Sequence, residues 1–256
     1  MKIALASAKV IDKDIDFNIN SMLEAIQDCS GQADMILFGE AVLQGFNSLC
    51  WGYEKDKEMA VALNDPPIRR MQEAAKEYGF AVSFGYIERV EESLYSSQIV
   101  IDSTGGIIHN YHRVSEGWKY YWLTDGHYRE GDAFETFSFK GRQFAIGLCG
   151  NLWTEGRPEE MKALHADVIL WPVCCGYDID EWNTQAKFEY AEQAALCGER
   201  VLFVDPTYIT DAAERTTSAA IYFKNGKIEA ELPVGESGIL IVEISDIPDL
   251  DREIFI

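Results

Sequence analysis

Two short apolar segments repeat the same pattern far apart in the chain. Residues 33–38 read ADMILF and residues 166–171 read ADVILW, and each follows a stretch of sequence with helical character. Four consecutive apolar residues after a polar start are typical of a buried strand. Because buried strands must be covered by other layers, the repeat predicts two halves, each with a mixed sheet and helices on one face.

The remaining elements are predicted from apolar spacing and from turn residues. Helices are expected after Asp16, after Asp65, from Pro158, and over 182–197. The residues at 103–106 (STGG) join two of the strands into a β-hairpin. Strands are expected at 3–8, 35–38, 80–86, 94–101, 107–111, 134–139, 143–149, 168–171, 200–205, 218–223, 227–232 and 239–244.

Stacking the two halves gives an α/β fold. The predicted architecture is a four-layer α-β-β-α sandwich of two stacked mixed sheets, with the helices outside. No stretch rich in proline, glycine or serine separates the halves. We therefore expect a single domain over residues 1–256.

The charge of the chain excludes several classes of partner. It has 43 acidic and 22 basic side chains, a formal net charge of -21. Phosphate backbones and anionic membrane surfaces bind to Lys/Arg patches, so nucleic acid and membrane partners are not expected. The chain also lacks a signal-peptide pattern and any run of about 18 apolar residues, so we expect a cytoplasmic location.

The six cysteines and four histidines show none of the spacings of a disulfide framework or a zinc site. One cysteine is distinguished by its context. Cys149 ends the expected strand 143–149 and is followed by Gly150 and Asn151. The other five are expected to be buried thiols, which is also the commoner role for any single cysteine.

A nucleophilic thiol needs a base and a group that stabilises an oxyanion. Glu40 comes directly after the expected strand 35–38, where a carboxylate can exchange a proton with a thiol. Arg113 and Lys119 are alternative cations, and both could equally be ordinary surface residues.

Residues 112–132 form a long segment without helical or strand spacing. It contains Trp118, Tyr120, Tyr121, Trp122 and Tyr128. Loops of this length inside a compact fold are more often functional than idle, so the aromatic side chains are expected either to wall a pocket or to pack at a dimer surface.

Several segments resemble the nitrilase superfamily of carbon-nitrogen hydrolases over almost the whole chain. Residues 33–40, followed by 44–46, resemble the segment with the catalytic glutamate, and 147–153 resemble the nucleophile segment. The chain lacks the arginine-alanine-glutamate-asparagine run that is common in the family before Arg200, and it departs from the family pattern at three single positions. Gly39 stands where proline is usual, Asn151 where aspartate is frequent, and Arg113, two residues after Tyr111, where the family has lysine.

The resemblance implies roles for individual residues. Cys149 would be the nucleophile, Glu40 would carry the proton, and Arg113 or Lys119 would hold the oxyanion with a backbone amide after Cys149. The family also has a second, supporting glutamate, which Asp125, Glu116 or Glu130 could provide. Substrate would be contacted by Trp118, Tyr121, Trp153 and Asn151.

The resemblance implies a thiol-dependent hydrolase of non-peptide carbon-nitrogen bonds. The reaction most expected is that of a small-molecule amidase, rather than a nitrilase, which releases ammonia through a cysteine thioester without a metal or organic cofactor. A homodimer is also implied. The alternative, motivated by the missing lysine, is a catalytically impaired binding or scaffold protein. A more distant alternative is a flavodoxin-like protein in which Cys149 senses oxidants.

Overall fold

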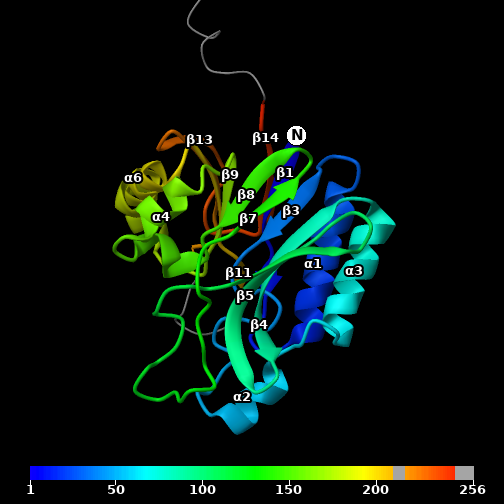
Figure 1. Cartoon of the computed structure of the whole chain (residues 1–256). Helices are drawn as coiled ribbons and strands as arrows, with labels where there is room; N and C mark the ends of the chain where they lie inside the picture. Colours follow the sequence, from blue (N-terminus) through cyan, green and yellow to red (C-terminus); the bar gives the residue numbers. More distant parts are fainter. Residues whose placement is uncertain (210–216, 246–256) are drawn as a thin grey trace, which may run out of the picture.

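Two six-stranded sheets form the centre of the computed structural model, which describes residues 1–209 and 217–245 (Figure 1). The first sheet has the order β14-β1-β3-β4-β5-β6. Its strands are β14 (Gly238–Glu243), β1 (Lys2–Ser7), β3 (Met35–Phe38), β4 (Ala81–Val90), β5 (Ser93–Ile101) and β6 (Ile107–His112). The second has the order β13-β12-β10-β9-β8-β7, with β13 (Lys227–Glu231), β12 (Ala220–Lys224), β10 (Arg200–Val204), β9 (Val168–Pro172), β8 (Arg142–Ile146) and β7 (Thr136–Phe139). A short parallel pair joins β2 (Lys9–Val10) and β11 (Thr207–Tyr208).

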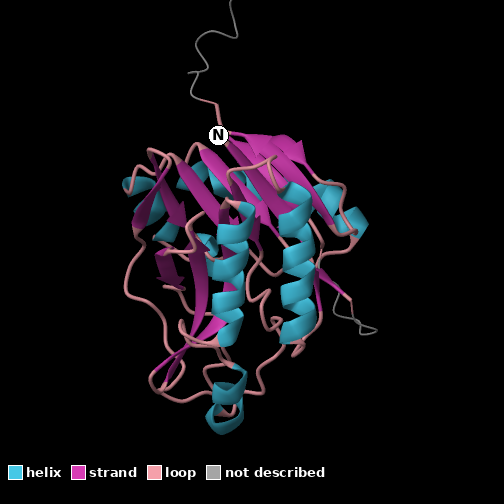
Figure 2. Cartoon of the chain, turned by 90° about the vertical axis from the view of Figure 1, so that its right-hand side faces the viewer, coloured by secondary structure: helices cyan, strands magenta, loops and turns pink. Residues whose placement is uncertain are grey.

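Both sheets are mixed. The central strands β1, β3 and β4 are parallel, as are β8, β9 and β10, and the outer pairs are antiparallel. The sheets face each other, with β1 against β10 and β3 against β9. Helices α1 (Ile15–Cys29) and α3 (Pro66–Tyr78) lie side by side on the outer face of the first sheet (Figure 2). Helices α4 (Arg157–Ala163) and α6 (Lys187–Cys197) cover the second, which confirms the four-layer sandwich.

The alternation of side chains explains why the strands read as continuous apolar runs. In β1, Ile3 and Leu5 face the core between the sheets, and Ala4 and Ala6 face the helices. In β3, Met35 and Leu37 point into the same inter-sheet core. Both faces of these two central strands therefore pack against apolar layers, which explains their continuous apolar sequence.

Four differences from the predicted elements have physical causes. The last strand, β14, pairs with β1 rather than with its own half, with Lys2 opposite Glu243, and so completes the hydrogen bonding of an otherwise open edge. The strand expected at 143–149 ends at Ile146, because Cys149–Trp153 forms a short 3₁₀-helix. The helix expected over 182–197 starts with a π-helical turn, Trp182–Ala186, after a short helical segment α5 (Ile179–Glu181). Helix α2 (Tyr53–Met59) was not predicted, because its apolar spacing is weak.

A glycine in β4 allows the turn after β3 to approach the sheet. A Cβ on Gly85 would lie 2.4 Å from the backbone nitrogen of Ala41 and 2.7 Å from the carbonyl oxygen of Gly39. The amide of Gly85 donates to that same carbonyl at 3.1 Å, and its own carbonyl accepts from Leu43 at 3.1 Å. The turn therefore rests directly on the backbone of β4.

We expect Gly85→Ala to lower the free energy of unfolding by about 1–3 kcal/mol, because backbone atoms cannot move aside as a flexible side chain can. Gly126→Ala is the matched control, since a Cβ there meets no atom within 4 Å. Urea unfolding of both variants measures the difference. Equal stability of the two variants would contradict the argument.

Candidate active site

Glu40 is held where the two sheets meet. It follows β3 of the first sheet, and its backbone amide donates to the carbonyl of Val173, just after β9 of the second sheet, at 3.1 Å. Gly39 is needed beside it, because a Cβ there would lie 2.6 Å from the ring of Pro206. Glu40 is fully buried, and the second sheet holds its backbone.

The partner of Glu40 is Arg113. Arg113 Nη1 donates to Glu40 Oε1 at 3.1 Å, and the two side chains are only 4% and 1% exposed. Ser96 Oγ donates to the same oxygen at 3.2 Å. Glu40 Oε2 and Arg113 Nε are buried without a hydrogen-bond partner in the described chain. Each member of the ion pair therefore keeps one buried polar atom that no described residue satisfies.

Burial opposes a charge on Arg113, but the negative charges of Glu40 and of ionised Cys149 outweigh it, and the pKa of the guanidinium lies above its ordinary value. Arg113 is thus a permanent cation. A planar guanidinium also fills more space than the ammonium of a lysine. Gly150 provides that space, since a Cβ there would lie 2.5 Å from Arg113 Nη2.

Cys149 starts the 3₁₀-helix with a positive φ of 48°, which is uncommon for a residue other than glycine. Its Sγ lies 3.9 Å from the carbonyl oxygen of Cys174. Burial first, and then the charge of Glu40, raise the pKa of the thiol to about 12, and Arg113 only partly offsets them. Burial and the neighbouring Glu40 thus favour the neutral form of the thiol.

The structure places Asn151 differently from the expected contact with substrate. Asn151 is fully buried, and its Oδ1 accepts from the hydroxyl of Tyr111 at 2.6 Å and from the amide of Leu148 at 3.1 Å. Its Nδ2 donates to Ser115 Oγ. All of its polar atoms have protein partners, so Asn151 supports the turn that carries Cys149.

Lys119 lies in a different cluster from Glu40. Its ammonium pairs with Glu130 Oε2 at 3.0 Å, donates to the carbonyl of Tyr128, and lies over the ring of Tyr121. The structure thus groups Arg113, rather than Lys119, with Glu40. Of the acidic alternatives for a supporting residue, Glu130 holds Lys119, Asp125 pairs with His127, and Glu116 contacts Arg113 through its carbonyl oxygen at 3.4 Å.

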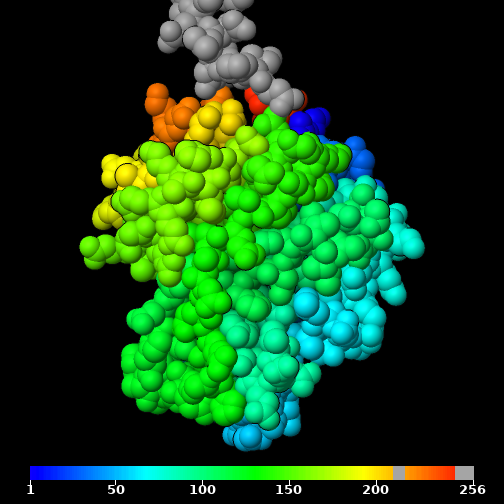
Figure 3. Space-filling view, in the orientation of Figure 1, coloured from blue at the N-terminus to red at the C-terminus, as the bar shows by residue number. Residues whose placement is uncertain are grey.

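The aromatic residues that were expected to contact substrate differ in their exposure. Trp118 is 4% exposed and packs with Trp51 and Tyr128 in a small cluster that includes Ala41, next to Glu40. Tyr121 and Trp153 are 42% and 44% exposed, and a contact with substrate stays a prediction for them. Figure 3 shows the loop between β6 and β7, in green, at the end of the molecule where α2 lies.

Sequence reasoning missed Ser96 and Cys174 and treated five cysteines as buried. Ser96 belongs to a strand without a recognisable motif, and only the pairing of β5 with its neighbours brings it to Glu40. Cys174 is half-buried, and Cys50 is exposed, which corrects the expectation for that thiol. No sequence signal distinguishes Cys50 or Cys174 from the other cysteines outside position 149, since none of them has a spacing motif.

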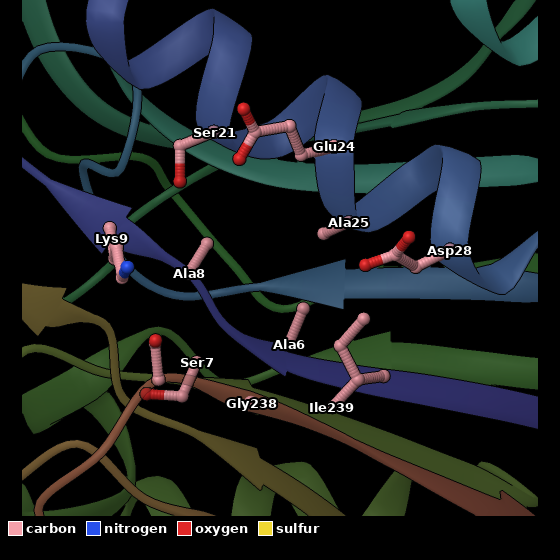
Figure 4. Close-up of a pocket in the computed structure, with 11 residues that line it drawn as sticks. Ala6, Ser7, Ala8, Lys9, Ser21, Glu24, Ala25, Asp28, Gly238 and Ile239 are labelled. Carbon is pink, nitrogen blue, oxygen red and sulfur yellow. The ribbon is translucent and has the colours of Figure 1, made fainter.

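A separate surface hollow lies on the outer side of the first sheet (Figure 4). It is lined by residues of α1, including Glu24 and Asp28, and by residues of β1 and β14, including Ala6 and Gly238. None of its lining residues belongs to the group around Glu40. In the part of the chain that the structure describes, no three His, Cys, Asp or Glu side chains form a metal-binding group, and no helix is long and apolar enough to cross a membrane.

Comparisons with known proteins show the family of the chain. A family model described as carbon-nitrogen hydrolase matches residues 2–247. The chain is 24% identical to an (R)-stereoselective amidase from a Pseudomonas species, over 66% of this chain and 59% of that protein. It is also 24% identical to an aliphatic nitrilase from Rhodococcus rhodochrous, over 95% of this chain and 72% of that protein.

Solved structures show the same fold. A mutant of the amidase from Nesterenkonia sp. AN1, with acrylamide added at its active-site cysteine, has a TM-score of 0.76 at 18% identity. The match covers 98% of this chain and 96% of that one. A glutamine-dependent NAD+ synthetase from Acinetobacter baumannii matches with a TM-score of 0.75 at 19% identity, over 94% of this chain and 44% of that one.

The contact between Gly150 and Arg113 predicts non-additive stability changes. Gly150→Ala should cost about 1–3 kcal/mol, because its methyl group would overlap the guanidinium. The cost should fall in an Arg113→Lys background, because a lysine has no branched terminus there. A double-mutant cycle by urea unfolding measures the coupling, expected at about 0.5–3 kcal/mol. Purely additive changes would show that the two residues do not share this space.

The raised pKa of Cys149 predicts an unusual alkylation profile. Only the thiolate reacts, so the rate with iodoacetamide should still rise about tenfold per pH unit between about pH 8 and about pH 10, without the plateau of an ordinary thiol. Glu40→Gln removes a negative charge that raises the thiol pKa, so its profile should move to lower pH. Peptide mapping follows Cys149, with exposed Cys50 as the internal reference. An unmoved profile in the variant would exclude Glu40 as a cause of the shift.

Proposed function

The chain belongs to the carbon-nitrogen hydrolase family, and from that premise we propose that it hydrolyses small-molecule amides and releases ammonia through a cysteine thioester. The observation that carries the proposal is the buried Glu40–Arg113 ion pair with the thiol of Cys149 beside it. A base, a cation and a nucleophile are the groups that this chemistry needs.

In the proposed acylation, Glu40 Oε2 takes the proton from Cys149 Sγ as the sulfur attacks the amide carbon. The carbonyl oxygen then carries a negative charge, which Arg113 and the backbone amide of Gly150 stabilise. Glu40 passes its proton to the departing nitrogen, the C–N bond breaks, and ammonia leaves. The acyl group remains on Cys149 as a thioester.

In the proposed deacylation, a water molecule takes the place of ammonia. Glu40 accepts a proton from the water as its oxygen attacks the thioester carbon, and the same cation stabilises the second oxyanion. The C–S bond then breaks, the acid leaves, and the proton returns from Glu40 to Cys149. The cycle uses one water and requires no metal or organic cofactor.

We propose amides rather than nitriles as the main substrates, and Trp118 as a wall of the acyl site through its cluster with Ala41. Neutral substrates suit a protein with a formal net charge of -21. Tyr121 and Trp153 remain proposed substrate contacts, and we propose that Asn151 positions the turn that carries Cys149.

We also propose a cytoplasmic, single-domain enzyme that acts as a homodimer. The exposed apolar residues Phe188 and Leu196 of α6 would form part of the dimer contact.

The test is ammonia release from a panel of simple aliphatic amides, with the matching nitriles in parallel. Cys149→Ala should abolish release, and intact mass should show an acyl adduct only on proteins that keep Cys149. Ammonia release that survives Cys149→Ala would rule out the thioester route. A wild-type protein that neither turns over substrate nor forms an adduct would favour the impaired binding or scaffold protein.

The two cations should differ sharply in effect. Arg113→Ala should lower kcat about 100- to 1,000-fold, the usual loss when an oxyanion donor is removed. Lys119→Ala should leave kcat within about threefold and mainly lower stability, because Glu130 loses its partner. Equal losses in kcat from both substitutions, measured on the same amide, would contradict the assignment of Arg113.

A further inference from the structure

Ser96 contacts both members of the buried ion pair. Its hydroxyl donates to Glu40 Oε1 at 3.2 Å, and its carbonyl oxygen accepts from the backbone amide of Arg113 at 2.9 Å. Ser96 lies in β5 and is only 3% exposed. Ser96 therefore holds the side chain of Glu40 and the backbone of Arg113.

The two donors to Glu40 use the same oxygen. Arg113 Nη1 and Ser96 Oγ both donate to Oε1, and Oε2 is buried without a partner among the described residues. The two oxygens of a carboxylate are chemically equivalent, and the torsion that exchanges them is soft. A single donor would leave the carboxylate free to turn about that contact. Donors from two directions hold one orientation.

We propose that Ser96 is a positioning residue that keeps Glu40 Oε1 occupied and Oε2 free to exchange the proton with Cys149. The inference deepens the proposed hydrolase and rests on it for its kinetic consequence. Without the hydroxyl, the carboxylate can turn and present both oxygens to Arg113. Proton transfer in acylation and deacylation would then slow, while the space for substrate would not change.

The neighbouring residue offers a matched control. Ser97 lies in the same strand and is fully buried, and its hydroxyl donates to a carboxylate, Glu88 Oε2, at 2.8 Å. Successive side chains of a strand point to opposite faces, so Ser97 faces away from Glu40. Glu88 also accepts from His112 at 2.8 Å. Removing either hydroxyl deletes the same kind of bond from the same strand.

The experiment compares Ser96→Ala, Ser97→Ala and Ser96→Thr in amide turnover and thermal unfolding. Ser96→Ala should lower kcat by about 10- to 100-fold with KM within about twofold, the low range for an impaired proton transfer. Ser97→Ala should keep kcat within about twofold despite a similar loss of Tm. Ser96→Thr, which retains the hydroxyl, should recover kcat to within about fivefold of the wild type.

Two results would overturn the inference. One is a kcat for Ser96→Ala within twofold of the wild type, and the other is an equal kcat loss in Ser97→Ala. A crystal structure of Ser96→Ala separates this inference from the proposed function if the wild type hydrolyses none of the amides. A turned Glu40 carboxylate would then support the positioning role while the hydrolase proposal fails. A carboxylate in its original orientation would refute the positioning role.

Discussion

A buried ion pair between Glu40 and Arg113 is the interaction around which the rest of the site is arranged. Burying one charge without the other would be strongly destabilising, so each residue requires the other to be in place. Glu40 follows β3 and Arg113 follows β6. These two strands are the first and the last of four neighbours, β3-β4-β5-β6, in the first sheet. The pair therefore depends on the pairing of β3, β4, β5 and β6 and holds the ends of these strands together.

The second sheet contributes the thiol and closes the site. Val173, after β9, accepts from the backbone amide of Glu40, and Cys149 follows β8 with a positive φ. Close approach of these segments is possible because glycines stand at the contacts. Gly39 faces Pro206, Gly85 lies under the turn at Ala41, and Gly150 leaves room for the guanidinium. Position 39 thus has no room for a side chain beside Pro206, and the guanidinium of Arg113 occupies the space that a side chain at position 150 would fill.

The aromatic loop and α2 form one side of this region. Trp118 and Tyr128 of the loop pack against Trp51, which precedes α2, and the hydroxyl of Tyr128 donates to Asp56 of α2 at 2.7 Å. Lys119 is held within the same loop by Glu130. The loop therefore uses its own cation to stabilise its conformation, while the cation beside Cys149 comes from the end of the sheet.

The sequence by itself determined the four-layer fold and the segments that carry Glu40, Arg113 and Cys149, because apolar runs and helical stripes are local properties of the chain. It also limited the cation to Arg113 or Lys119. Only the tertiary structure shows which of them lies at Glu40, since pairing across β5 and β6 brings Arg113 and Ser96 to Glu40 and leaves Lys119 with Glu130. The pairing of β14 with β1, the burial and hydrogen bonds of Asn151 and the exposure of Cys50 likewise depend on the tertiary structure. These features depend on contacts between residues far apart in the chain, and neither periodicity nor composition records such contacts.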